Sequence, residues 1–76
     1  MKIYVGYVDI ICGEYGFLGT HILVCDSIDE AKKRMKEYVE EENRVYPGET
    51  CYKLNGVEEL GYIDGYKIDY KLRKII

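Results

Sequence analysis

The chain has 76 residues, a formal net charge of −3 and a hydrophobic fraction of 47%. This length allows one domain with a small core, and the apolar content excludes a disordered chain. The mildly acidic balance argues against nucleic-acid binding, which needs a basic surface. A small core in an apolar chain favours self-association, because a dimer hides surface that a monomer leaves exposed. We therefore expect a single domain over residues 1–76 that forms a homodimer through a strand edge or through the tyrosine-bearing face of its sheet.

The cysteine count and the first residues indicate the compartment. The number of cysteines is odd, and no two of them have Cys-x-x-Cys spacing. This pattern predicts reduced thiols rather than a disulfide framework or a zinc site for Cys12, Cys25 and Cys51. The N-terminal residues lack the pattern of a signal peptide. No apolar run approaches the roughly 20 residues that span a bilayer. The sequence thus predicts a cytoplasmic protein without membrane contact.

Residues 2–12 and 20–25 are the first two predicted strands, and they form a hairpin. Apolar residues occupy both faces of 2–12, with Asp9 as the exception. Such a strand is typical of the centre of a sheet, covered on both sides. Residues 13–19 contain three glycines and predict a long loop.

This loop is the first candidate site. Tyr15, Phe17 and Leu18 would be displayed there for a protein partner. Alternatively, Phe17 and Leu18 fold back over the open end of the core. A phosphate-binding loop is less well supported, because the glycines lack the Lys-Ser/Thr of a P-loop and do not lead into a helix.

Ser27 and Glu30 form a capping-box pattern that predicts the start of a helix. The helix should cover about residues 28–44 and end before Pro47-Gly48. Apolar residues recur at helical spacing along it, so we expect one face to pack on the sheet. These residues are Ile28, Ala31, Met35, Tyr38 and Val39.

Two dipeptides, Asn55-Gly56 and Asp64-Gly65, suit the type I′ turns of two-residue hairpins. They predict strands on either side of each turn, with Lys53 opposite Glu58 in the first hairpin. These strands cover residues 50–54, 57–63 and 66–75, although 57–61 also fits a turn of helix.

Together these elements predict an α+β fold. The elements follow each other along the chain as β-β-α-β-β-β, or β-β-α-β-β. The strands form an antiparallel sheet, and one amphipathic helix packs on one face of it, which gives two layers.

The predicted strand 66–75 carries the second candidate site. Lys67, Lys71 and Arg73 share its polar face, which gives a basic stripe on an acidic protein. This stripe suits a small anionic ligand such as a nucleotide, bound at an oligomer interface. The alternative is a solvated edge that lysines protect from aggregation. Tyr66 and Tyr70 alternate to the other face, which weakens the case for base stacking.

Catalytic and metal-binding patterns are missing from the sequence. His21 is the only histidine, and the only serine, Ser27, belongs to the helix cap. Cys25 lies roughly 13 Å along the strand from His21, too far for a catalytic dyad. We therefore expect no enzyme activity, no catalytic residue, no metal and no cofactor.

The remaining function class is a binding module. In size and composition, though through no motif, the chain resembles inhibitors and sequestering proteins that phages and mobile elements encode. The leading interpretation is a non-catalytic module that acts by protein–protein interaction, as an inhibitor or anti-defence protein. The second is a sequestering protein for a small anionic ligand.

Overall fold

The fold comes from a computed structural model that describes residues 1–45, 48 and 50–75. Its elements are β1 (Lys2–Cys12), β2 (Tyr15–Cys25), α1 (Ile28–Val45), β3 (Thr50–Glu59), β4 (Tyr62–Ile63) and β5 (Tyr66–Lys67). The predicted α+β class and the β-β-α-β-β-β order are confirmed. Pro47, part of the predicted helix stop, lies outside the described residues.

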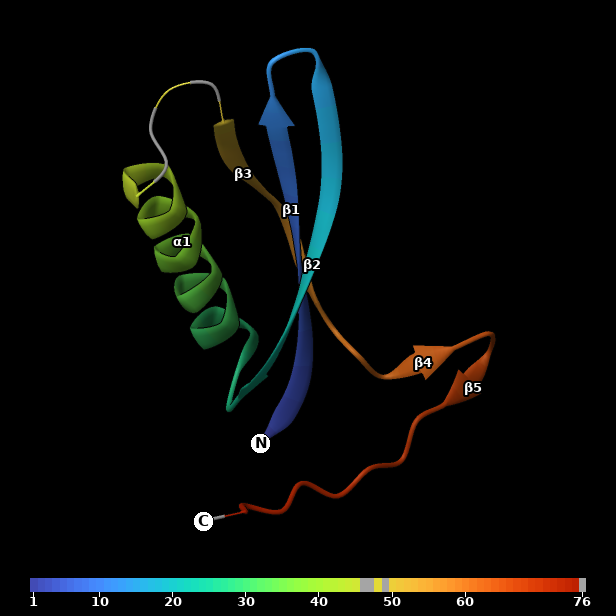
Figure 1. Cartoon of the computed structure of the whole chain (residues 1–76). Coiled ribbons are helices and arrows are strands. Elements are labelled where there is room, and N and C mark those ends of the chain that lie inside the picture. Colours follow the sequence, from blue (N-terminus) through green and yellow to red (C-terminus); the bar gives the residue numbers. More distant parts are fainter. Residues whose placement is uncertain (46–47, 49, 76) are drawn as a thin grey trace.

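Strand β1 is central, as predicted, and lies in an antiparallel three-stranded sheet with the order β2-β1-β3. Helix α1 covers one face of this sheet (Figure 1). The prediction that β1 is covered on both sides is wrong. On the face away from α1, Ile11 is exposed, and Ile3, Val5 and Tyr7 are only half-buried, because the single helix can cover one side only.

The connection between β1 and β2 is shorter than predicted. Only Gly13 and Glu14 form the turn, and β2 begins at Tyr15, directly opposite Cys12. Gly13 has a φ of 59°, the positive value that the first central position of a type II′ turn requires. The predicted loop 13–19 is therefore mostly strand, since the long β1 offers a pairing partner to each of these residues.

The first predicted type I′ hairpin does not form. Strand β3 runs through Asn55-Gly56 and pairs with β1 along its length, with Lys53 opposite Asp9 and Glu58 opposite Val5. Asn55 is the extra residue of a β-bulge, and its side-chain amide donates to Asp9 Oδ1 at 3.2 Å. Continued pairing with the central strand gives more ladder hydrogen bonds than folding back would.

The second predicted hairpin is confirmed. Asp64 and Gly65 both have positive φ, 51° and 80°, as a type I′ turn requires. The predicted strand 66–75 is wrong beyond Lys67, because β4 is only two residues long and offers no further partner. Within the described chain, β4 and β5 contact each other and no other element, and the hairpin stands away from the sheet on the side opposite α1 (Figure 1).

The predicted helix and its capping box are confirmed, with one change. Ser27 Oγ accepts the backbone N–H of Glu30 at 3.2 Å. The Glu30 carboxylate reaches back one residue further than the usual box, to the N–H of Asp26 at 3.0 Å. Both hydrogen bonds satisfy backbone N–H groups at the junction between β2 and α1.

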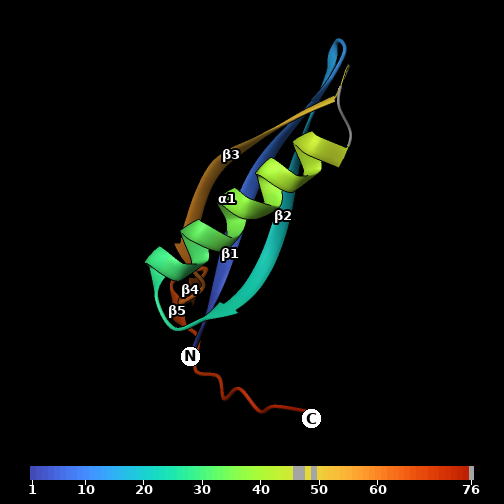
Figure 2. The ribbon, with the colours of Figure 1, turned by 90° about the vertical axis from the view of Figure 1, so that its left-hand side faces the viewer.

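Helix α1 lies along the sheet (Figure 2), and the core between them forms two clusters. The predicted helix face is confirmed, with its central residues buried and Ile28 and Tyr38 half-buried. The clusters are Tyr4, Cys25 and Ala31 near the start of the helix, and Val8, Met35 and Val39 further along.

Candidate functional site

The end of the β1–β2 hairpin displays large apolar side chains. Tyr15, Phe17 and Leu18 are 72%, 61% and 61% exposed. The hairpin extends past the last turn of α1 (Figures 1 and 2), so the helix does not cover these residues. The alternative in which Phe17 and Leu18 close the core is wrong.

The strand register separates these three residues into two groups. Tyr15 and Phe17 lie opposite Cys12 and Ile10, on the sheet face that α1 covers lower down. Leu18 is the next residue of the strand, so its side chain points to the other face. The structure thus brings Tyr15 and Phe17 together as one aromatic surface and places Leu18 behind it.

The glycines of this region do not form an anion-binding loop. Gly16 and Gly19 belong to β2, where successive N–H groups point to opposite edges of the strand. Their amides therefore do not converge on one point.

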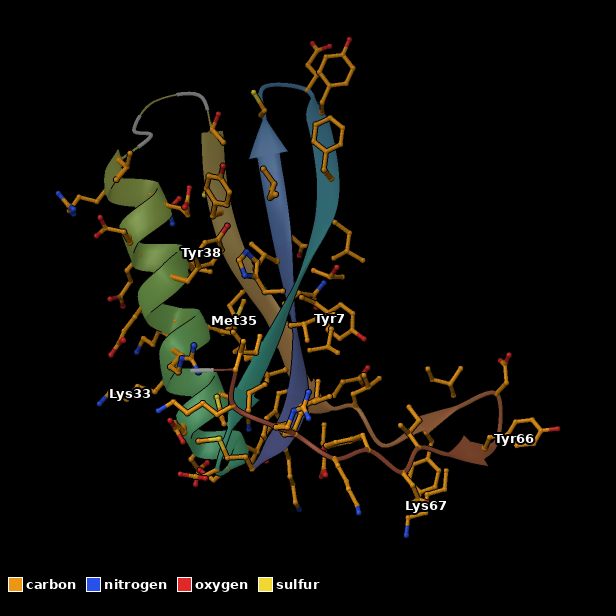
Figure 3. The ribbon with its side chains drawn as sticks, turned by 60° about the horizontal axis from the view of Figure 1, so that its bottom comes forward. Tyr7, Lys33, Met35, Tyr38, Tyr66 and Lys67 are labelled. Atoms are coloured by element: carbon orange, nitrogen blue, oxygen red, sulfur yellow. The ribbon has the colours of Figure 1, made fainter. Side chains whose placement is uncertain are left out.

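The predicted basic residues are spread along the C-terminal segment. Lys67 lies on the β4–β5 hairpin, away from the sheet (Figure 3). It lines a hollow of about 370 Å³ that Glu59 and Asp69 also line. Arg73 lines a different hollow, beside Val24, and Lys71 lines neither. The structure does not bring the three together, because residues 68–75 are not the strand that would have aligned them.

The histidine and the buried thiol have structural partners. The ring of His21 packs on that of Tyr38 from α1, with centroids 4.1 Å apart. Asp9 lies on the opposite sheet face, so it does not support His21 as a base. Cys25 is fully buried and accepts a hydrogen bond from Arg34 at 3.3 Å. Over the described residues, His, Cys, Asp and Glu form no cluster that could hold a metal ion.

Tyr7 is the clearest electrostatic feature of the sheet face opposite α1. Its hydroxyl donates to the Glu58 carboxylate across the β1–β3 pair. This hydrogen bond, with partial burial, raises the pKa of Tyr7 above its ordinary value. The phenol is thus held neutral and oriented.

The face of the sheet opposite α1, here called the open face, is the surface that sequence reasoning missed. Ile22 is its most exposed large apolar residue, at 70%. The sequence held a usable signal, because one helix can cover only one face of a sheet and the apolar residues of both strands alternate between faces. The other apolar residues of the open face are Ile3, Val5, Tyr7, Ile11, Leu18 and Val24.

In the part of the chain that the structure describes, no helix is long and apolar enough to cross a membrane. Comparison with models of protein families, with curated proteins and with solved structures found no match.

Proposed function

We propose that this chain is a non-catalytic binding module that acts, as an inhibitor would, by holding a protein partner at the end of its β1–β2 hairpin. Tyr15 and Phe17 are the anchors of this interaction. Leu18, on the reverse side of the same strand, contacts a partner that encloses the hairpin end.

The observation that carries this proposal is the exposure of two neighbouring aromatic rings on a paired strand. Tyr15 and Phe17 are separated by one residue and are 72% and 61% exposed. Rings held on a rigid hairpin lose little conformational freedom on binding, and aromatic residues are enriched among the side chains that dominate interface energies. A protein surface with an apolar pocket fits such a pair.

The second candidate is a small anionic ligand bound by the C-terminal segment, and it has weaker support. Lys67 and Arg73 line separate hollows, and two acidic residues, Glu59 and Asp69, also line the hollow of Lys67. In addition, Lys2 pairs with Glu59 there at 3.6 Å. An anion would therefore meet mixed charge rather than a concentrated positive field.

Affinity purification from the cell that naturally encodes the chain, followed by native mass spectrometry, tests the proposal. The test variant is Tyr15→Ala with Phe17→Ala. Its matched control is Tyr62→Ala with Tyr66→Ala, which removes two similarly exposed rings from the β4–β5 hairpin. If each residue contributes about 2 kcal/mol as a hot spot, removing both should lower the affinity for the partner far more than tenfold.

We expect a protein that co-purifies with the wild type and with the control pair but not with the test pair. Retention of every bound protein by a folded test variant would overturn the hairpin site. A retained small molecule that is lost only in Lys71→Glu with Arg73→Glu would favour the anionic ligand instead.

A further inference from the structure

We propose that two copies of this chain pair through the outer edges of their β2 strands. The strands run antiparallel about a two-fold axis, so that the two three-stranded sheets join into one continuous sheet. The paired edges would provide the surface for the self-association that composition favours. They do not involve Tyr15 or Phe17, but they share Leu18 with the proposed partner site at the hairpin end.

The register shows which backbone groups β2 offers at its outer edge. The Ile3 carbonyl accepts from Leu60 N–H at 2.9 Å and the Ile3 N–H donates to the Tyr70 hydroxyl at 2.9 Å. Both Ile3 groups therefore point away from its partner Val24. Because hydrogen-bonded and non-hydrogen-bonded pairs alternate in an antiparallel ladder, Val24 and every second residue before it turn their own N–H and C=O groups outward.

Most of this outer edge has no partner in the described chain. No strand lies beyond β2 in the sheet order, and of its outward groups the structure shows only the Val24 carbonyl bonded, to Arg34 at 3.0 Å. The groups of Leu18, Thr20 and Ile22 remain free for another strand. Strand β2 has eleven residues without a charged residue or a proline, and an edge of this kind is a template for strand pairing.

The opposite edge of the sheet carries the protection that β2 lacks. Strand β3 is bulged at Asn55 and contains Lys53, Glu58 and Glu59. Its outward-facing Tyr52 is already bonded, because the Asn43 side chain accepts from Tyr52 N–H and donates to Tyr52 C=O, both at 2.8 Å. Bulges, charges and covering side chains are the usual devices against edge pairing. Of the two edges of this sheet in the described residues, the β2 edge is therefore the better suited to a second copy.

The β2 edge is also complementary to itself. With the two-fold axis at Thr20, the Thr20 residues face each other and Leu18 faces Ile22 of the second copy. All three are outward-facing residues, so each pair can exchange both backbone hydrogen bonds. Leu18 and Ile22 lie on the open face, where their side chains would form apolar cross-strand contacts.

The size of the chain agrees with a missing partner. Its accessible surface is 6234 Å², whereas a folded monomer of its mass exposes about 4,800 Å². Its radius of gyration is 14.4 Å, against about 11 Å for a compact domain of this length. This excess is larger than the roughly 800 Å² that each partner buries in a standard interface. It includes the surface of the β4–β5 hairpin, which stands away from the sheet, so it supports association without locating it at β2.

Sedimentation velocity with amide hydrogen exchange tests the pairing. The test variant is Thr20→Lys, which places two ammonium groups opposite each other at the axis and should raise the dimer dissociation constant about tenfold or more. Thr20→Val keeps the strand and is the matched control. Ile11→Lys adds the same charge to the open face of the central strand, away from the edge.

We expect dimers for the wild type, Thr20→Val and Ile11→Lys, and weakened association for Thr20→Lys. The amides of Leu18, Thr20 and Ile22 should be protected in the dimer and exchange on dilution, while those of Gly19 and His21 stay protected in both states. A monomer at high micromolar concentration would overturn the proposal. So would a dimer that Ile11→Lys disrupts and Thr20→Lys does not, or one in which the alternate amides exchange freely.

Discussion

The side chain of Met35 lies directly against the Cα of Gly6, at the point where α1 crosses the central strand. A Cβ placed on Gly6 would come within 2.5 Å of Met35 Sδ, and Met35 itself is fully buried. Figure 3 shows Met35 directed from the helix toward the sheet. Gly6 thus leaves a space on the helix-facing side of β1, and the Met35 side chain fills it.

Gly6→Ala should therefore lower the free energy of unfolding by about 1–3 kcal/mol, because the new methyl group overpacks the core. Met35→Ala should lower it by about 2–5 kcal/mol through the cavity it leaves. The double variant should lose less than the sum, with a coupling of about 0.5–3 kcal/mol. Urea denaturation of the wild type, the two single variants and the double variant measures this coupling.

Gly56→Ala is the control for this cycle. It lies in β3 with nothing within 4 Å of an added Cβ, so it should change stability by less than about 0.5 kcal/mol. Strict additivity of the Gly6 and Met35 substitutions would show that the two residues are not in contact.

The paired hydrogen bonds between Asn43 and Tyr52 join the last turns of α1 to the edge of β3. Asn43→Ala should cost about 1–3 kcal/mol, because two part-buried backbone groups lose their partner. Asn43→Asp should be destabilised as well, since a carboxylate cannot donate to the Tyr52 carbonyl. Denaturation of both variants gives the values. A fully stable Asn43→Asp would contradict the donor role of this amide.

Stability should fall above pH 10. Burial raises the pKa of Tyr4 and Tyr38, and the Glu58 hydrogen bond raises that of Tyr7, each from an ordinary value of 10.0. The unfolded chain loses these protons first, so the stability they contribute is complete below pH 10 and disappears as pH rises through the folded values. Urea denaturation between pH 8 and 11 measures the decline.

Tyr7→Phe should make this alkaline decline shallower, because it removes one of the three linked groups. Tyr15→Phe, at an exposed position on the hairpin end, is the control and should leave the decline as in the wild type. An unchanged pH dependence in Tyr7→Phe would show that its bond to Glu58 does not form in solution.

The three thiols should react in a fixed order. Cys51 is exposed, Cys12 is half-buried beside Thr50, and Cys25 is fully buried. A maleimide should modify Cys51 in the first and fastest phase of the reaction and Cys25 only when the fold opens. Intact and peptide mass spectrometry follow the modification of each thiol. Cys51→Ser should abolish the first phase, and modification of Cys25 as fast as Cys51 would contradict the core described above.

The local signals of the sequence predicted α1 well, and they were less decisive for the strands. Ser27 and Glu30 act within one turn, so the helix start depends on little else. Asn55-Gly56 and Asp64-Gly65 carry the same turn preference but differ in outcome. The first lies where the long β1 can pair with it, and the second lies beyond the reach of that strand.

The candidate site was predictable in part for the same reason. The three glycines of residues 13–19 predicted a loop that displays Tyr15 and Phe17, and both residues are exposed although the segment is mostly strand. Their separation from Leu18 depends on these residues belonging to a strand rather than a loop, because side chains alternate between the two faces only in a strand. Pairing with β1 makes this segment a strand despite the glycines nearby. The loss of the basic stripe is likewise a consequence of the two-residue length of β4.

Val57 packs against both core clusters, and it belongs to the strand that is translated after the helix. During translation, the β1–β2 hairpin and α1 are made before β3, so the core first lacks the strand that carries Val57. We expect the nascent chain to stay loosely collapsed until Val57 leaves the exit tunnel, and then to acquire its fixed packing in a single late step.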